Sequence, residues 1–120
     1  MKKILIVEDE ADMCLLLNII LNGKDFSLDH VKTLAAAGDY LQSTPPDLVL
    51  LDNKLPDGLG IDFIPDIKKN YPKVKVIMLS GFDASAGDVA LENGADTFLS
   101  KPFSKEQLKQ VVQGVLSNGQ

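Results

Sequence analysis

Short apolar runs alternate with amphipathic stretches along the whole of this chain. Residues 4–7, 48–51 and 74–79 are mostly apolar without alternation, which is typical of strands covered on both faces of a parallel sheet. Residues 26–31 alternate between apolar and polar side chains, which predicts an edge or half-buried strand. With a last strand at residues 95–99, the pattern predicts five strands.

A stretch with helical spacing of its apolar residues follows each predicted strand. The predicted helices span residues 11–21, 34–41, 59–70 and 83–92, with a last one after Ser104. Thr33 is placed to cap the second helix. Ser104 and Gln107 match a capping box for the last helix, and Phe103 and Leu108 occupy the positions of a hydrophobic staple.

Two helices carry features that modify this pattern. Leu15 and Ile19 widen the apolar stripe of the first helix, so we expect that helix to be well buried. Pro65 lies within the third helix, where it lacks an N–H and clashes with the carbonyl of Ile61 four residues earlier. We therefore expect the regular part of that helix to begin near Asp62, or the helix to be kinked.

Five strand–helix pairs in strict alternation indicate an α/β fold. Such a chain forms a parallel sheet, doubly wound with helices on both faces and connected by right-handed crossovers. A length of 120 residues suits one domain with one core, spanning residues 1–120.

The composition is that of a globular protein, and it argues against several partners. A net charge of -5 disfavours nucleic acid and anionic membranes, since both require basic patches. The only cysteine, Cys14, excludes an internal disulfide and suits a reducing cytosol. The first apolar run is interrupted at residues 8–10, too early for a signal peptide, and no stretch is long enough to span a membrane. We therefore expect a cytoplasmic protein.

Polar residues of different types stand where the predicted strands end. They are Glu8, Asp9, Asp52, Ser80 and Lys101. In an open parallel sheet these strand ends meet at one edge, where ligands bind. Two carboxylates about 4 Å apart repel by roughly 4 kcal/mol at an effective dielectric of about 20. A cluster of three acids therefore indicates a divalent cation such as Mg²⁺, which prefers carboxylates, waters and phosphate oxygens.

These five residues predict a phosphoryl-transfer site. Carboxylates form aspartyl phosphates in covalent catalysis, so Asp52, at the end of a buried strand, is the expected nucleophile. Asp9, and Glu8 through water, would hold Mg²⁺. Lys101 and Ser80 would bind the phosphoryl oxygens. Each residue alone has a simpler explanation, as a solvated strand end, a turn residue or a helix N-terminal charge, and it is their register that favours a site.

Four segments that carry these residues resemble the receiver domain of two-component response regulators. They are ILIVEDE at residues 4–10, DLVLLDNKLPDG at 47–58, VIMLSG at 76–81 and GADTFLSKPF at 94–103. They follow one another in the order of that family and at nearly its spacing, and the resemblance covers the whole chain. It implies a single receiver domain with a flavodoxin-like, three-layer fold and the strand order 2-1-3-4-5.

The resemblance also implies phosphorylation-controlled signalling. A sensor histidine kinase would transfer a phosphoryl group to Asp52 in the presence of Mg²⁺, and the domain would catalyse only its own phosphorylation and dephosphorylation. The backbone carbonyl of Lys54 would be a further metal ligand. The peptide between Lys101 and Pro102 would be cis.

A switch at Ser80 and Phe98 is implied as well. Ser80 would move toward the phosphoryl group and Phe98 would turn inward, which would change the surface of the fourth helix, fifth strand and fifth helix. That surface would then bind an output domain, a partner protein or a second copy of the chain. Lys54 and Phe82 depart from the family's common residues at two positions that often tune the lifetime of the phosphorylated state, and Phe98 lacks the hydroxyl of the commoner tyrosine.

Three other functions compete with this one. A degenerate receiver that only binds partners is opposed by the intact set of five site residues. A Mg²⁺-dependent phosphohydrolase commonly has a second acid two residues after its nucleophile, where this chain has Lys54. A flavin-binding domain of the same fold would need a Ser/Thr/Gly-rich phosphate loop, and none follows the first strand. The sequence does not identify the kinase, the signal or the output.

Overall fold

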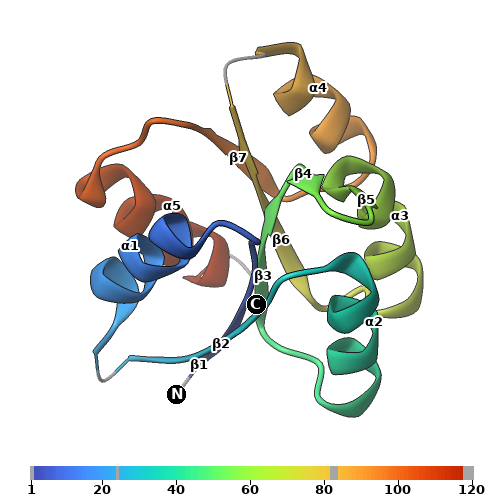
Figure 1. The fold of residues 1–120 in the computed structure, drawn as a ribbon, viewed down its shortest axis with the longest axis horizontal. Helices are drawn as coiled ribbons and strands as arrows, with labels where there is room; N and C mark the ends of the chain where they lie inside the picture. The colour runs from blue at the N-terminus through green and yellow to red at the C-terminus, as the bar shows by residue number, and fades with distance from the viewer. Residues whose placement is uncertain (1, 24, 82–83, 118–120) are drawn as a thin grey trace.

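Five parallel strands form the sheet at the centre of the computed structural model, which describes residues 2–23, 25–81 and 84–117 (Figure 1). In spatial order they are β2 (Phe26–Val31), β1 (Lys2–Val7), β3 (Leu48–Asp52), β6 (Lys75–Ser80) and β7 (Thr97–Ser100). Every neighbouring pair is parallel. Counted along the chain, the strands of this sheet have the order 2-1-3-4-5, which confirms the predicted fold.

Helices cover both faces of the sheet. One face carries α1 (Ala11–Leu21) and α5 (Lys105–Ser117), and the other carries α2 (Leu34–Ser43), α3 (Gly60–Asn70) and α4 (Ala84–Glu92) (Figure 1). No helix within the described parts of the chain is long and apolar enough to cross a membrane.

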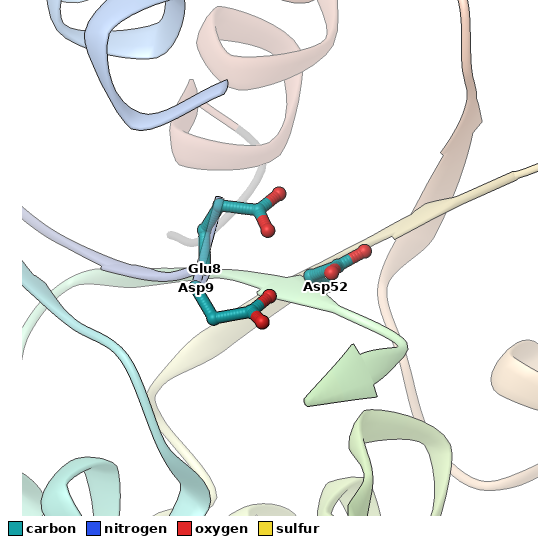
Figure 2. Close-up of side chains that lie close together, drawn as sticks. All are labelled: Glu8, Asp9 and Asp52. Carbon is teal, nitrogen blue, oxygen red and sulfur yellow. The ribbon is translucent and has the colours of Figure 1, made fainter. Parts of the chain in front are cut away.

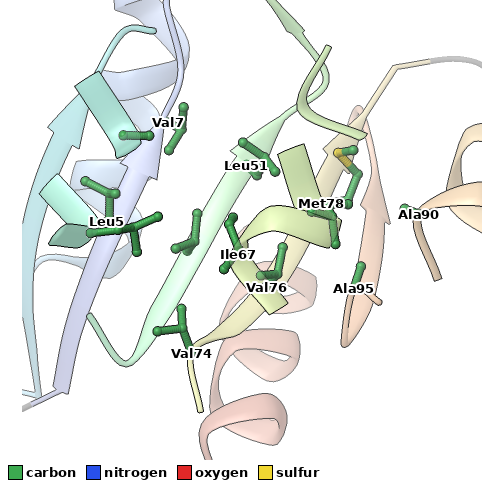
Figure 3. Packing of buried hydrophobic residues seen from close by; sticks show 13 residues of the cluster. Leu5, Val7, Leu51, Ile67, Val74, Val76, Met78, Ala90 and Ala95 are labelled. Atoms are coloured by element: carbon green, nitrogen blue, oxygen red, sulfur yellow. The ribbon is translucent and has the colours of Figure 1, made fainter. Parts of the chain in front are cut away.

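Successive side chains of each strand enter opposite cores. Leu5, Val7 and Leu51 pack with residues of α2 and α3 (Figure 3). Ile4, Ile6 and Leu50 pack with residues of α1 and α5. Residues 4–7 and 48–51 are completely buried, and this two-sided burial explains why their sequences do not alternate.

Helix α1 is less buried than its sequence predicts. Its outer residues Leu15 and Ile19 are 61% and 64% exposed, and Leu16 is 41% exposed. The expectation of a well-buried α1 is therefore wrong. A helix on a sheet buries one stripe only, and α1 is apolar on its outer side as well. The buried residues of α1 are Cys14, Leu17, Ile20 and Leu21.

Helix α2 receives side-chain caps from two parts of the chain. The predicted cap is confirmed, because Thr33 Oγ1 accepts a hydrogen bond from the N–H of Ala36 at 3.1 Å. The carboxylate of Asp57 also accepts hydrogen bonds from the N–H groups of Leu34 and Ala35, at 2.9 and 3.0 Å. Asp57 lies in the turn between β4 (Lys54–Leu55) and β5 (Gly58–Leu59), a small antiparallel hairpin that the sequence did not predict.

Helix α5 starts with the predicted capping box. The N–H of Gln107 donates to Ser104 Oγ at 3.1 Å, and the N–H of Ser104 donates to Gln107 Oε1 at 2.8 Å. Phe103 packs against the core cluster that contains Leu108, as expected of a hydrophobic staple.

Helix α3 contains Pro65 and still begins at its predicted apolar pattern. It starts at Gly60, within two residues of the expected start near Asp62, and a kink at Pro65 stays a prediction. The carbonyl of Ile61, which Pro65 cannot serve, accepts a hydrogen bond from Asn93 Nδ2 at 2.9 Å. The proline is tolerated here because a side chain from outside the helix replaces its missing donor.

Candidate functional site

Three carboxylates meet at the carboxyl edge of the sheet. Glu8 and Asp9 directly follow β1, and Asp52 is the last residue of β3 (Figure 2). One carboxylate oxygen from each lies within 4.8 Å of the others. The register of the parallel strands causes this meeting, because Val7 pairs with Leu51 and so places the two strand ends side by side.

Lys101, which follows β7, neutralises part of this negative charge. Its Nζ lies 2.9 Å from Asp52 Oδ1 and 3.3 Å from Glu8 Oε1. Glu8 is completely buried and Asp52 is 6% exposed. Both carboxylates are therefore shielded from solvent, and inside the protein a charge without a partner is costly.

The burial of this cluster changes the pKa values of two groups. Burial raises the pKa of Glu8 from 4.5 to about 7, and the negative charge of Asp52 adds to the shift. The N–H of Glu10 and the Lys101 ammonium act in the opposite direction but do not cancel it. For Lys101, burial alone would lower the pKa, but the hydrogen bonds and charges of Asp52 and Glu8 raise it above its ordinary value. The lysine is thus held in its charged form.

Ser80 adds a hydroxyl that makes no hydrogen bond within the described parts of the chain. It ends β6 and is 2% exposed, and among the described residues its Oγ is a buried oxygen without a hydrogen-bond partner. Buried hydroxyls are normally paired, so such an oxygen points to a ligand. Ser80 also lines the same pocket as Asp52 and Lys101.

The pocket over these residues is open to solvent and of mixed character. Its lining includes Asp9, Glu10, Met13, Asp52, Lys54, Ser80, Lys101 and Pro102. The structure thus places Asp9, Asp52, Ser80 and Lys101 around one pocket, while Glu8 is buried, contacts Lys101 and is not a lining residue. Met13 also lines the pocket and packs partly against the core, a position that the sequence pattern did not predict.

The residues after Asp52 hold strand β3 against helix α3. The N–H of Gly60 donates to the carbonyl of Asn53 at 2.7 Å, and the N–H of Ile61 donates to Asn53 Oδ1 at 3.1 Å. A β-carbon on Gly60 would overlap the carbonyl oxygen of Asp52. Glycine is therefore required for this close approach of α3 to the strand that carries Asp52.

Phe98, a residue of β7, packs against helix α4. It is half-buried, and its ring fills the space that a β-carbon on Gly87 would need. Its movement on phosphorylation stays a prediction, and Phe82 lies outside the described residues. The peptide between Lys101 and Pro102 is cis, the isomer that the family resemblance implies.

The arrangement combines three kinds of group that suit one chemistry. The carboxylates of Asp9 and Asp52, with Glu8 behind them, match the oxygen donors that Mg²⁺ prefers. The Lys101 ammonium and the Ser80 hydroxyl, which has no partner among the described residues, are donors for an anion. Asp52 belongs to the carboxylate cluster that suits a cation and also lies next to the donors that suit an anion. Its carboxylate can therefore act as a nucleophile toward an anion bound there.

Comparisons with known proteins agree with this geometry. A family model described as the response regulator receiver domain matches residues 4–113. KDP operon transcriptional regulatory protein KdpE of Escherichia coli is 38% identical over 110 residues, which are 91% of this chain and 48% of KdpE. Response regulator protein PilR of Pseudomonas aeruginosa is 34% identical over 116 residues, covering 96% of this chain and 26% of PilR. The chain thus spans a quarter to about half the length of these relatives.

Solved structures show the same fold over nearly the whole chain. The solution structure of the beryllofluoride-activated NtrC4 receiver domain dimer has a TM-score of 0.93 at 32% identity and covers 100% of both chains. The crystal structure of the NtrX receiver domain from Brucella abortus has a TM-score of 0.90 at 30% identity, covering 96% of this chain and 98% of that one.

Proposed function

The chain belongs to the family of response regulator receiver domains, and from this membership we propose that it is a signalling domain whose Asp52 accepts a phosphoryl group. The observation that carries the proposal is the surroundings of Asp52, which is paired to Lys101 at 2.9 Å and shares its pocket with the hydroxyl of Ser80, an oxygen without a partner among the residues that the structure describes. A carboxylate with only a structural role would not need a pocket lined by both a cation and a hydroxyl donor.

We propose that Asp9 and Asp52 hold Mg²⁺, that Glu8 contributes through water, and that the backbone carbonyl of Lys54 completes the protein ligands. The carboxylate cluster supports this assignment, because its oxygens lie close enough together to share one ion. When bound, Mg²⁺ supplies positive charge to the phosphoryl oxygens and to the attacking carboxylate. The partly buried Lys101 supplies the charge on the other side.

The proposed step is the transfer of a phosphoryl group from a phosphohistidine of a sensor kinase. A carboxylate oxygen of Asp52 forms a bond to phosphorus while the bond from phosphorus to the histidine nitrogen breaks, and the electron pair of that bond returns to the imidazole. Lys101 and Ser80 hold the phosphoryl oxygens during the transfer. The domain would then catalyse only its own phosphorylation and dephosphorylation.

We further propose the partners and the place of this domain. Residues 1–120 would form one receiver domain that acts in the cytoplasm, controlled by a histidine kinase. The surface of α4, β7 and α5 would pass the signal to an output domain or partner, or to a second copy of the chain. Two relatives support these alternatives, since KdpE is a transcriptional regulatory protein and the activated NtrC4 receiver domain is a dimer.

Intact mass measurement after incubation with acetyl phosphate and Mg²⁺ tests the acceptor. We expect the wild type to gain one phosphoryl group that is labile to base, and we expect no gain with Asp52→Asn or with a chelator. Asp66→Ala, which removes an exposed acid on α3, is the matched control and should be labelled like the wild type. A wild type that binds Mg²⁺ but gains no mass would favour the degenerate receiver, which only binds partners.

The side chain of Lys54 is exposed at the pocket and is proposed to set how long the phosphoryl group persists, together with Phe82. An ammonium near the aspartyl phosphate changes the access and orientation of the attacking water. We expect Lys54→Met to change the first-order decay rate of the label several-fold while labelling itself persists. Decay is measured by mass after removal of acetyl phosphate, and an unchanged rate would exclude this role for Lys54.

A further inference from the structure

Both backbone groups of Ile61 are bound by asparagine side chains from other elements. Its N–H donates to Asn53 Oδ1 at 3.1 Å, and its carbonyl accepts from Asn93 Nδ2 at 2.9 Å. Asn53 directly follows the acceptor Asp52, and Asn93 directly follows helix α4. One residue of α3 therefore joins the loop that follows Asp52 to the C-terminal end of α4.

Pro65 is what leaves the carbonyl of Ile61 available. In a regular helix that carbonyl would accept the N–H of residue 65, four positions later, but proline has no N–H. Asn93 donates there in its place. The proline that disfavours a helix in the sequence thus creates an acceptor for a contact between two helices.

The corner that contains Asn93 is attached to α3 at a second point. Lys68, about two turns beyond Ile61, lies 2.9 Å from Asp96 Oδ2 and also donates to the carbonyl of Val74 at 2.8 Å. A β-carbon on Gly94 would lie 3.1 Å from Lys68 Cγ, so the corner packs tightly on that side chain. Residues 93–96 therefore lie directly on α3 and follow its position.

We propose that the hydrogen bonds Asn53–Ile61–Asn93 connect the loop that follows Asp52 to the C-terminal end of α4. This connection is separate from the switch at Ser80 and Phe98 that the family resemblance implies. A displacement of Asn53 moves the first turn of α3, and Asn93 carries that displacement to residues 93–96. That phosphorylation of Asp52 drives the displacement rests on the proposed function. The connection itself exists in the unphosphorylated protein.

A double-mutant cycle in urea tests the role of Pro65. Asn93→Ala should lower the midpoint of unfolding in the wild type, because it leaves the carbonyl of Ile61 without a donor. In a Pro65→Ala background residue 65 supplies that donor, so the same change should have at most half the effect. Asn70→Ala is the matched control, since Asn70 Nδ2 donates to the carbonyl of Asp66 within α3. This change should lower the midpoint of unfolding by the same amount in both backgrounds. Equal effects of Asn93→Ala in both backgrounds would overturn the role of Pro65.

Amide hydrogen exchange tests the connection without phosphorylation. Asn53→Ala should speed exchange at residues 93–96 at least threefold, and this increase should vanish when Asn93 is already alanine. The same increase in the Asn93→Ala background, or none in the wild-type background, would overturn the connection.

Phosphorylation supplies the last measurement. We expect the amide chemical-shift changes of residues 93–96 on treatment with acetyl phosphate and Mg²⁺ to fall by half or more in Asn93→Ala. Labelling measured by mass should remain equal to the wild type, because Asn93 does not line the pocket around Asp52. A wild type that is never labelled would contradict the proposed function, while the exchange result would still decide the connection.

Discussion

Glu8 shows how strongly burial influences a single residue of the site. Its carboxyl is completely inside the protein, next to Asp52 and only partly compensated by Lys101. A pKa raised from 4.5 to about 7 corresponds to a change of roughly 3 kcal/mol in the free energy of unfolding between low pH and pH above 7. The raised pKa means that the folded protein binds the Glu8 proton more tightly than the unfolded chain does. The contribution of Glu8 to stability is therefore present at low pH and is lost as pH rises toward 7.

Replacement of Glu8 by glutamine should remove this pH dependence. Without Mg²⁺, we expect Glu8→Gln to gain on the order of 2–3 kcal/mol over the wild type as pH rises from 4.5 to above 7. Urea denaturation of both proteins across that range measures the difference. Glu10→Gln, which changes an exposed acid two residues away, is the control and should follow the wild type. A constant difference between Glu8→Gln and the wild type would contradict the raised pKa.

The residues of the site could be predicted from the sequence because strand ends of a parallel sheet meet at one edge. Asp52 and Ser80 each end an apolar run, and the parallel order of the strands places these ends side by side. The pairing of Lys101 with both Glu8 and Asp52 could not be predicted. It depends on the direction of one long side chain, which is set by three-dimensional packing and not by any pattern along the chain.

At the scale of elements, helix α1 exposes an apolar patch close to the pocket. The patch consists of Leu15, Leu16 and Ile19, and α1 begins at the pocket, which Glu10 and Met13 line. Under the proposed function, a protein that presents a phosphohistidine to Asp52 would dock on this patch, because docking there would bring its histidine over the pocket. A small phosphodonor would not need the patch.

This difference between donors gives a test of the α1 patch. We expect Leu15→Ser with Ile19→Ser to slow transfer at least tenfold from a phosphorylated histidine-kinase fragment that labels the wild type. The rate of labelling by acetyl phosphate should stay within twofold of the wild-type rate. Such a result would also show that the variant is folded. Leu91→Ser changes an equally apolar residue on α4, 43% exposed, and should leave both rates unchanged. An equal loss with both donors would argue against docking on α1.

The elements themselves were largely predictable, and the exceptions have physical causes. A helix rich in leucine gives no sign of which side faces the sheet, so the exposure of Leu15 and Ile19 had to come from the structure. Pro65 indicated a later start or a kink in α3 because the rule considers donors within the helix only. Asn93, a residue from another element, supplied the missing hydrogen bond.

At the scale of the whole molecule, two contacts join parts that the sequence keeps far apart. Asp57, in the hairpin after the acceptor strand, caps α2, which begins 23 residues earlier. Asn93 joins α4 to α3. The alternation of strands and helices predicts the layers and the strand order, since few topologies satisfy the rules of right-handed, short connections. The topology rules do not determine which single side chains touch across those layers. Such contacts also produce no periodic pattern in the sequence.

The contact between Gly60 and the carbonyl of Asp52 limits how this chain can evolve. Every mutation at residue 60 adds a β-carbon, and no β-carbon fits while the acceptor strand keeps its place. Six residues earlier, the side chain of Lys54 projects into solvent and can be exchanged without such a penalty. Selection can therefore change Lys54, which is proposed to set the lifetime of the phosphoryl group. Gly60, which packs against the carbonyl of Asp52 only six residues later, can hardly be substituted.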